Sequence, residues 1–124
     1  AFSKGLGAVH SMSHAIGADQ ELRLHHGTLN GVILPPVLRF NKDHVGDKYP
    51  RIAQAMGKNE SADLATEIEK LNEKIGLPIG LKEMGVTEDM IPELVKHSIT
   101  DPSNVTTPRL PNPEEWERLF LDAM

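Results

Sequence analysis

The sequence predicts an all-α protein built as one helical bundle. Apolar residues recur at the three- and four-residue spacing of amphipathic helices along nearly the whole chain. Apolar and polar residues do not alternate over any long segment, and the β-branched residues are scattered, so no segment is typical of a strand. Several periodic segments also begin or end with residues typical of helix caps. We therefore expect a single helical domain over residues 1–124.

The composition is that of a soluble globular protein and excludes several function classes. The net charge of -5 and the lack of a basic patch argue against nucleic acid as a partner. The absence of cysteine excludes disulfides and thiolate metal sites, and it fits a cytoplasmic protein. No apolar run approaches the roughly 20 residues that a membrane span needs. The chain lacks an initiator methionine, so we expect further sequence before Ala1.

Two helices are expected at the start of the chain. The first should cover about residues 2–16, without a visible N-terminal cap. A short loop over residues 17–25 follows, and a second helix should run over residues 26–40. Pro35 and Pro36 must kink or interrupt this second helix, because proline removes a backbone donor.

The middle of the chain predicts two more helices. Asp47 can cap a third helix that stops at Gly57, and Asn59 or Ser61 can cap a fourth that ends at Gly76. The apolar stripe of the fourth helix consists of Leu64, Ile68, Leu71 and Ile75.

The last third of the chain predicts two helices separated by a loop. Thr87 can start the first of them, although Pro92 makes its boundary ambiguous. Residues 100–111 are rich in proline and threonine and should form a loop. The segment 112–115 then starts the last helix with an asparagine cap, a proline at the first position and a glutamate that closes a capping box.

Histidines near the start of the chain are the candidates for chemistry. His10 and His14 are four residues apart, so on a helix both imidazoles project from one face, where they can hold or neighbour one metal ion. His26 begins the next helix, where the loop can fold it back toward the pair. Spacing alone favours the simpler alternative of solvated surface histidines. The zinc-protease pattern does not apply, because Ser11 stands where its glutamate would be.

Motifs along the whole chain resemble those of a known enzyme family. The segment from His10 to Ala18, followed by His26-Gly27-x-x-Asn30 and Leu34-Pro35, resembles the second signature of iron-containing (group III) alcohol dehydrogenases. Further matching motifs are Arg39-Phe40-Asn41, Ile75-Gly-Leu-Pro78, Gly85-Val86 and Thr107-Pro108-Arg109.

The resemblance implies a fold and a set of site residues. It implies that the chain is the C-terminal part of the helical domain of a dehydroquinate synthase-like enzyme, after an NAD(P)-binding α/β domain. In that family one Asp and three His hold a divalent metal between the two domains. By resemblance His10 and His26 are the third and fourth ligands, with His25 as the alternative to His26. His14 would lie near the nicotinamide and the substrate, as a catalytic proton relay in contact with the cofactor.

The resemblance also implies cofactors and partners. The metal would be Fe(II) or Zn(II), acting as a Lewis acid on an alcohol oxygen. NAD or NADP would bind through the missing N-terminal domain, the substrate would be a small alcohol, aldehyde or ketone, and the enzyme would be a homo-oligomer. We expect this chain alone to be inactive, since it holds only two of the four ligands. The competing hypothesis is a stand-alone helical interaction module without a catalytic role.

Overall fold

The computed structural model describes residues 5–19 and 21–124, which form helices and connecting loops without any strand. The α-helices in chain order are α1 (Ala8–Gly17), α2 (His26–Asn41), α3 (Lys48–Ala55), α4 (Leu64–Lys74), α5 (Ile91–Thr100) and α6 (Pro113–Asp122). Three short 3-10 helices join them, namely η2 (Lys42–His44), η3 (Glu88–Met90) and η4 (Pro102–Thr106). The predicted all-α fold is confirmed for these residues. None of their helices is both long and apolar enough to cross a membrane.

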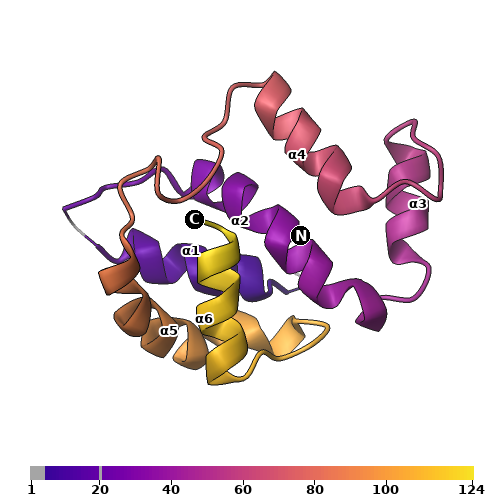
Figure 1. The fold of residues 1–124 in the computed structure, drawn as a ribbon. Helices are drawn as coiled ribbons and strands as arrows, with labels where there is room; N and C mark the ends of the chain where they lie inside the picture. The colour runs from indigo at the N-terminus through magenta and orange to yellow at the C-terminus, as the bar shows by residue number, and fades with distance from the viewer. Residues whose placement is uncertain (1–4, 20) are drawn as a thin grey trace.

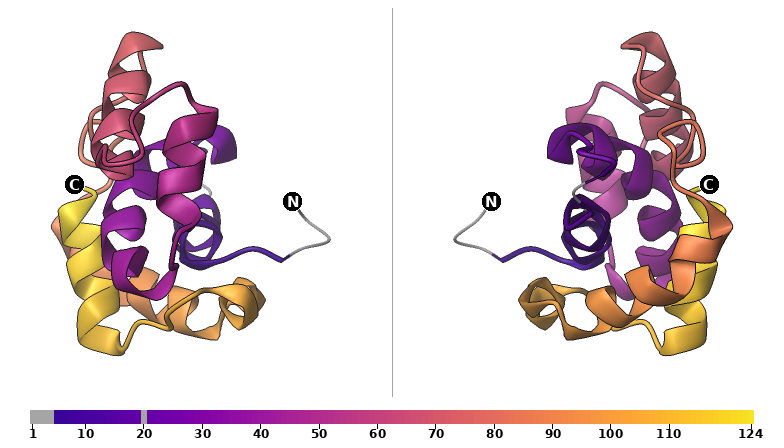
Figure 2. Two further views of the ribbon diagram at one scale, coloured as in Figure 1. Left: turned by 90° about the vertical axis from the view of Figure 1, so that its right-hand side faces the viewer. Right: turned by 90° about the vertical axis from the view of Figure 1, so that its left-hand side faces the viewer.

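Helix α2 lies at the centre of the fold. It packs against α1, α4 and α6, and α1 also packs against α5 (Figures 1 and 2). Helices α3 and α4 stand to one side of the body that the other four helices form (Figure 1). The side chains that fill the core are aliphatic apart from two aromatic residues of α6, and the most deeply buried are Met12, Ile16, Leu29, Ile33, Leu81, Val86, Trp116 and Phe120.

The first helix begins later than the sequence predicted. Residues 5–7 are not helical, and α1 starts at Ala8 after an extended Gly7 that offers no side-chain cap. The prediction that the helix begins at Phe2 is therefore wrong for residues 5–7, and Phe2 itself lies outside the described residues. The physical reason is the pair of glycines in this segment, since glycine loses the most backbone entropy on entering a helix.

The two prolines do not interrupt α2, so of the two predicted effects, a kink or an interruption, the interruption is wrong. The helix continues from His26 to Asn41, with both prolines buried inside it. Because Pro35 has no N–H, the carbonyl of Gly31, four residues earlier, loses its helical donor. The side chain of Asn72 replaces that donor, with its Nδ2 donating to the Gly31 carbonyl at 2.8 Å. A hydrogen bond from α4 thus compensates for the proline in α2.

The fourth helix differs from its prediction in its cap and in its apolar stripe. Asp63, rather than Asn59 or Ser61, caps α4 by accepting a hydrogen bond from the Thr66 N–H at 3.1 Å. This contact and the bond from the Thr66 hydroxyl hold the pKa of Asp63 below its usual value. Within the stripe only Leu64 is fully buried, Ile68 is half-buried, and Leu71 and Ile75 are exposed. The stripe predicted the helix correctly but not the depth of its burial.

The ends of several helices follow the sequence prediction. Gly57 and Gly76 both adopt positive φ, +73° and +75°, just after α3 and α4, a conformation that favours glycine. The capping box of α6 is complete, because Asn112 and Glu115 each accept a hydrogen bond from the other's backbone N–H. Residues 100–111 were predicted as a loop throughout, which is wrong for η4.

Helix α3 is held to α2 by one polar contact. The Tyr49 hydroxyl donates to the carbonyl of Leu38 at 3.1 Å. Burial raises the pKa of Tyr49 to about 12, so the phenol remains a neutral donor at physiological pH. The contact holds α3 against α2, the helix that begins at His26.

Asn72→Ala should lower the free energy of unfolding by about 1–3 kcal/mol, because it leaves a partly buried carbonyl of α2 without a donor. In a Pro35→Ala background the restored N–H can reach the Gly31 carbonyl, so the same Asn72→Ala change should cost less. Urea unfolding of the four proteins in this double-mutant cycle measures the coupling. Equal costs of Asn72→Ala in the two backgrounds would contradict the compensation.

Candidate metal centre

Three histidine side chains from two helices lie against one another. His10 and His14 belong to α1, and His26 is the first residue of α2. The ring centroids are 5.8 Å apart for His10 and His14, 5.4 Å for His10 and His26, and 5.3 Å for His14 and His26. The structure therefore brings together the three histidines that the sequence singled out. The spacing within one helix does not explain this cluster, because the third ring comes from the start of α2.

The local sequence accounts for the position of each ring. Met12 and Ile16 bury one face of α1 in the core, which turns His10 and His14 toward the start of α2. Leu29 anchors the first turn of α2 in the same core. Since α1 and α2 pack side by side, as Figure 1 shows, His26 meets the pair.

His25 has a structural role that the sequence analysis missed. It is the N-cap of α2, and its Nδ1 accepts a hydrogen bond from the Thr28 N–H at 3.4 Å. Its ring folds over Gly27, where an added Cβ would lie 3.1 Å from the ring. Of the two adjacent histidines, His26 is therefore the one that lies against His10. A histidine just before a helical segment was the signal for this cap.

Ser13 orients the ring of His26. The Ser13 hydroxyl donates to the His10 carbonyl at 3.1 Å, which leaves its oxygen as an acceptor. Nδ1 of His26 lies 3.4 Å from that oxygen. The Nδ1–H of a neutral imidazole would satisfy this contact and leave Nε2 with a free lone pair, the form that binds metals.

The side chain of Asn30 contacts the rings of His10 and His26. Its Nδ2 is 3.1 Å from Nε2 of His26 and 3.4 Å from Nε2 of His10. Its Oδ1 is buried and has no hydrogen-bond partner among residues 5–19 and 21–124. Asn30 belongs to the motif His26-Gly27-x-x-Asn30, which by itself indicated no role for it.

Asp101 is the carboxylate that the sequence analysis did not find. Its Oδ2 lies 3.0 Å from Nδ1 of His14, 87 residues away in the sequence. The carboxylate is only 12% exposed, whereas the His14 side chain is 42% exposed. Its other oxygen accepts the Ser103 N–H at 2.7 Å and so caps η4. The pattern Asp-Pro-Ser at the end of α5 signalled a cap, but nothing in the sequence placed it beside His14.

The charges around the cluster favour a neutral His10 beside an ionised Asp101. Burial lowers the pKa of His10, and the neighbouring rings of His26 and His14 lower it further, while Asp101 opposes them. Burial raises the pKa of Asp101, but the hydrogen bonds from Ser103 and His14 outweigh it and hold this pKa below its usual value. Neutral imidazole is the form that a metal ion requires, because the lone pair must be free.

The donor set fits part of a metal centre. Imidazole nitrogens suit Fe(II) and Zn(II), and the unpartnered Oδ1 of Asn30 shows a polar group that the described residues do not satisfy. Within residues 5–19 and 21–124, however, no three His, Asp or Glu side chains are placed to hold one ion. Two imidazoles leave a site open, so the described residues provide part of a ligand set rather than a closed one.

An apolar groove of about 420 Å³ opens beside His10. It runs between the start of α1 and one face of α2, next to the loop at Thr107 and Pro108. Aliphatic side chains dominate it, namely Leu6, Val9, Leu34, Val37 and Leu38. Asn41 also lines the groove, and its buried Oδ1 is a second amide oxygen without a partner among the described residues. The groove thus places an apolar surface next to His10 and Asn30 of the histidine cluster.

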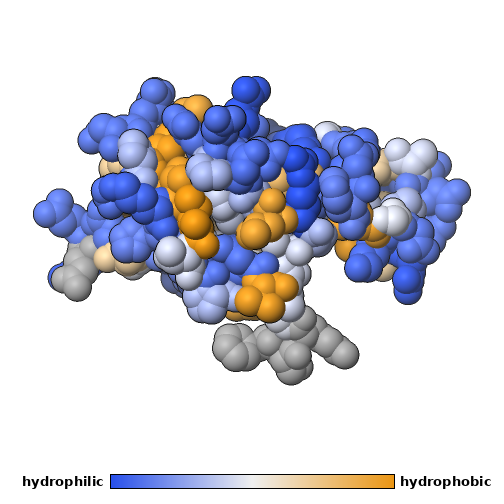
Figure 3. Space-filling model, turned by 90° about the horizontal axis from the view of Figure 1, so that it is seen from below, coloured by the Kyte–Doolittle hydropathy of each residue, from blue (hydrophilic) through white to orange (hydrophobic). Residues whose placement is uncertain are grey.

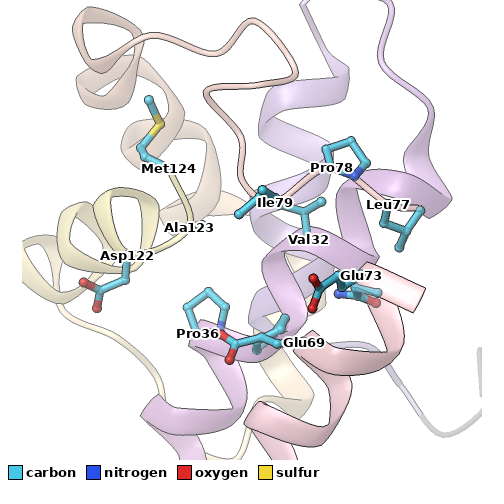
Figure 4. A pocket seen from close by; sticks show the side chains of 12 residues that line it. Val32, Pro36, Glu69, Glu73, Leu77, Pro78, Ile79, Asp122, Ala123 and Met124 are labelled. Carbon is cyan, nitrogen blue, oxygen red and sulfur yellow. The ribbon is translucent and has the colours of Figure 1, made fainter. Parts of the chain in front are cut away.

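Other hollows lie away from the histidines. The one drawn in Figure 4 has about 500 Å³ and is bounded by α2, α4 and the C-terminal end, and the side chains that line it include Pro36, Glu69, Glu73 and Asp122. Figure 3 shows that apolar residues on another face form separate patches among hydrophilic ones. None of the residues that line the hollow in Figure 4 is a histidine, so it offers no comparable chemistry.

Comparisons with known proteins identify the family to which the chain belongs. The family model "Fe-containing alcohol dehydrogenase family, C-terminal" matches residues 1–124. The chain is 40% identical to the 4-hydroxybutyrate dehydrogenase of Cupriavidus necator, with all of this chain and 34% of the relative aligned. It is 35% identical to the lactaldehyde reductase of Escherichia coli (strain K12), with 96% of this chain and 33% of the relative aligned.

Solved structures show the same fold. A crystal structure of a 1,3-propanediol oxidoreductase superposes with a TM-score of 0.88 at 31% identity, covering 96% of this chain and 33% of that one. The iron-containing alcohol dehydrogenase from Thermococcus thioreducens superposes with a TM-score of 0.80 at 31% identity, covering 95% and 32%. The chain spans about one third of the length of the relatives that it matches. The chain therefore belongs to the Fe-containing alcohol dehydrogenase family and matches the C-terminal part of its members.

Proposed function

We propose that this chain supplies half of the divalent metal centre of an NAD(P)-dependent alcohol dehydrogenase. The observation that carries the proposal is the meeting of His10, His14 and His26, with Nε2 of two rings directed at the same side chain. Family membership supports the reaction class, an interconversion of alcohols with aldehydes or ketones. It also disfavours the stand-alone interaction module, which no contact of the cluster supports.

The ligands in this proposal are His10 and His26, each through Nε2. Fe(II) or Zn(II) bound there would act as a Lewis acid on an alcohol oxygen. The low pKa of His10 supports this role, because a neutral ring gives up no proton to bind the ion. The Nδ1 contact between His26 and Ser13 supports the second ligand, since outer contacts of this kind fix the orientation of metal-binding imidazoles. The remaining ligands would come from a segment of the intact protein before residue 1.

His14 is proposed as the proton relay, with Asp101 as its positioning residue. A hydrogen bond from Nδ1–H of His14 to Asp101 leaves Nε2 free to accept a proton and later release it. The carboxylate stabilises the ring when it carries the extra proton. His14 is partly exposed, so a nicotinamide or an alcohol can approach it.

The substrate in this proposal is a small alcohol or aldehyde, as the relatives' names suggest. The first relatives are called 4-hydroxybutyrate dehydrogenase and lactaldehyde reductase. NAD or NADP would bind to the preceding part of the intact enzyme, which we propose to be a cytoplasmic homo-oligomer.

In the intact protein, His10→Ala and His26→Ala should each lower the content of bound metal by at least about tenfold, because each removes a ligand. His25→Ala is the matched control: it removes a neighbouring imidazole and a helix cap, so it should lower stability while retaining the metal. Elemental analysis after dialysis measures the bound metal. Full metal content in both ligand variants would contradict the assignment.

Asp101→Asn should lower kcat by about 10–100-fold while the metal content stays unchanged. Asparagine has a single carbonyl oxygen, so if that oxygen keeps the cap of η4, the NH2 group faces Nδ1 of His14. The change therefore removes both the negative charge and the acceptor for Nδ1–H of His14. Steady-state kinetics and metal analysis of the same samples measure both effects. Loss of the metal together with activity would show that Asp101 supports the ligands rather than the relay.

The 124-residue chain alone should not oxidise alcohols. Its described residues provide no closed ligand set, and losing the orientation of cofactor and substrate alone can remove about 7–11 kcal/mol of barrier lowering. The measurement is NADH or NADPH absorbance with the purified chain, anaerobic Fe(II) or Zn(II), and a panel of short alcohols and diols. Turnover above that of a His10→Ala control would overturn this expectation.

A further inference from the structure

We propose that Asn30 is a positioning residue of the metal centre, whose side-chain amide marks the place of the ion and holds His10 and His26 in the tautomer that binds it. The inference rests on the proposed function, because it takes these two histidines as the ligands. Neither the family motif nor the relatives' names give Asn30 this role.

The first step is the pair of contacts from one nitrogen. Nδ2 of Asn30 lies 3.1 Å from Nε2 of His26 and 3.4 Å from Nε2 of His10. A side-chain amide has two N–H groups, so Nδ2 can donate one to each ring. Both Nε2 atoms are then acceptors without a hydrogen, and both lone pairs point at Asn30.

The second step is an independent contact on His26. The hydrogen of the Ser13 hydroxyl is donated to the His10 carbonyl, so the Ser13 oxygen can only accept from Nδ1 of His26. That contact requires Nδ1–H and therefore an Nε2 without hydrogen, which is the tautomer that the amide of Asn30 also requires. Two neighbours on opposite sides of the ring select the same state.

The third step is the unpartnered oxygen. Oδ1 of Asn30 is buried without a donor, although buried amide oxygens ordinarily have one. The reverse orientation, with Oδ1 toward the rings, would require a hydrogen on both Nε2 atoms and would remove the lone pairs that a metal needs. The unpaired oxygen is thus the cost of directing Nδ2 at the two imidazoles.

A divalent cation and Nδ2 of Asn30 consequently compete for the same two lone pairs. The ion takes the place of the amide hydrogens, and the rings need not change tautomer when it binds. An Asp at position 30 would direct a carboxylate oxygen, a good ligand for Zn(II) or Fe(II), at the point where the two lone pairs meet.

The first experiment measures the tautomers in the metal-free 124-residue chain, by imidazole ¹⁵N chemical shifts of wild type and Asn30→Leu. We expect Nδ1–H in His10 and His26 of the wild type, and a mixture of tautomers in the variant. Nε2–H in both rings of the wild type would overturn the proposal. This readout does not depend on a bound metal.

The second experiment titrates Co(II) into the same chain and follows its visible absorption bands. Asn30→Asp should bind Co(II) at least about tenfold more tightly than wild type, because it adds a carboxylate ligand where wild type has a competing amide. Asn112→Asp is the matched control, because it adds the same charge and keeps its cap on α6, and it should bind like wild type. Far-UV circular dichroism checks that each variant is folded.

The outcomes separate the two proposals. If Asn30→Asp binds no better than Asn112→Asp while His10→Ala still weakens binding, the metal centre stands and the role of Asn30 is overturned. If His10→Ala binds like wild type, the proposed metal function itself fails. A gain in Asn30→Asp that His10→Ala abolishes supports both.

Discussion

The contact between α1 and α2 is the constraint on which the rest of the structure depends. Both helices bury an aliphatic face in one core, through Met12 and Ile16 on one side and Leu29 and Ile33 on the other. Burial of such side chains stabilises by about 1.5–3 kcal/mol each, which is far more than any contact among the histidine rings contributes. The apolar packing therefore sets the positions of the rings, and the polar contacts only adjust their orientation.

The sequence predicted most helices because their signals are local. The capping box at Asn112 and the glycines after α3 and α4 act within a few residues, so a pattern in the sequence contains the whole interaction. The same locality explains the grouping of His10 and His14 on one face. The continuation of α2 through Pro35 could not be predicted, because Asn72, which compensates for the missing donor, lies 41 residues after its acceptor Gly31.

In the candidate site, too, local features could be predicted from the sequence and long-range contacts could not. The three histidines were found from spacing and from resemblance, whereas their outer contacts were not. Asp101 and Asn104 both come from the end of α5 and η4, and they reach α1 only because the fold returns the chain there. Asp101 contacts His14, and Asn104 accepts from the Ser11 hydroxyl at 2.6 Å. Pairings across about 90 residues leave no periodic trace in a single sequence.

The bond between Asn72 and the Gly31 carbonyl has a consequence for the dynamics of the site. Gly31 directly follows Asn30, whose side chain contacts the rings of His10 and His26. The hydrogen bond from Asn72 therefore connects α4 to the backbone of α2 one residue away from the histidine cluster. A transient detachment of α4 would leave that carbonyl to water and loosen α2 one residue from the cluster. We therefore expect amide hydrogen exchange in α4 and in the first turns of α2 to be coupled, so that a remote, largely exposed helix helps to keep the histidine cluster rigid.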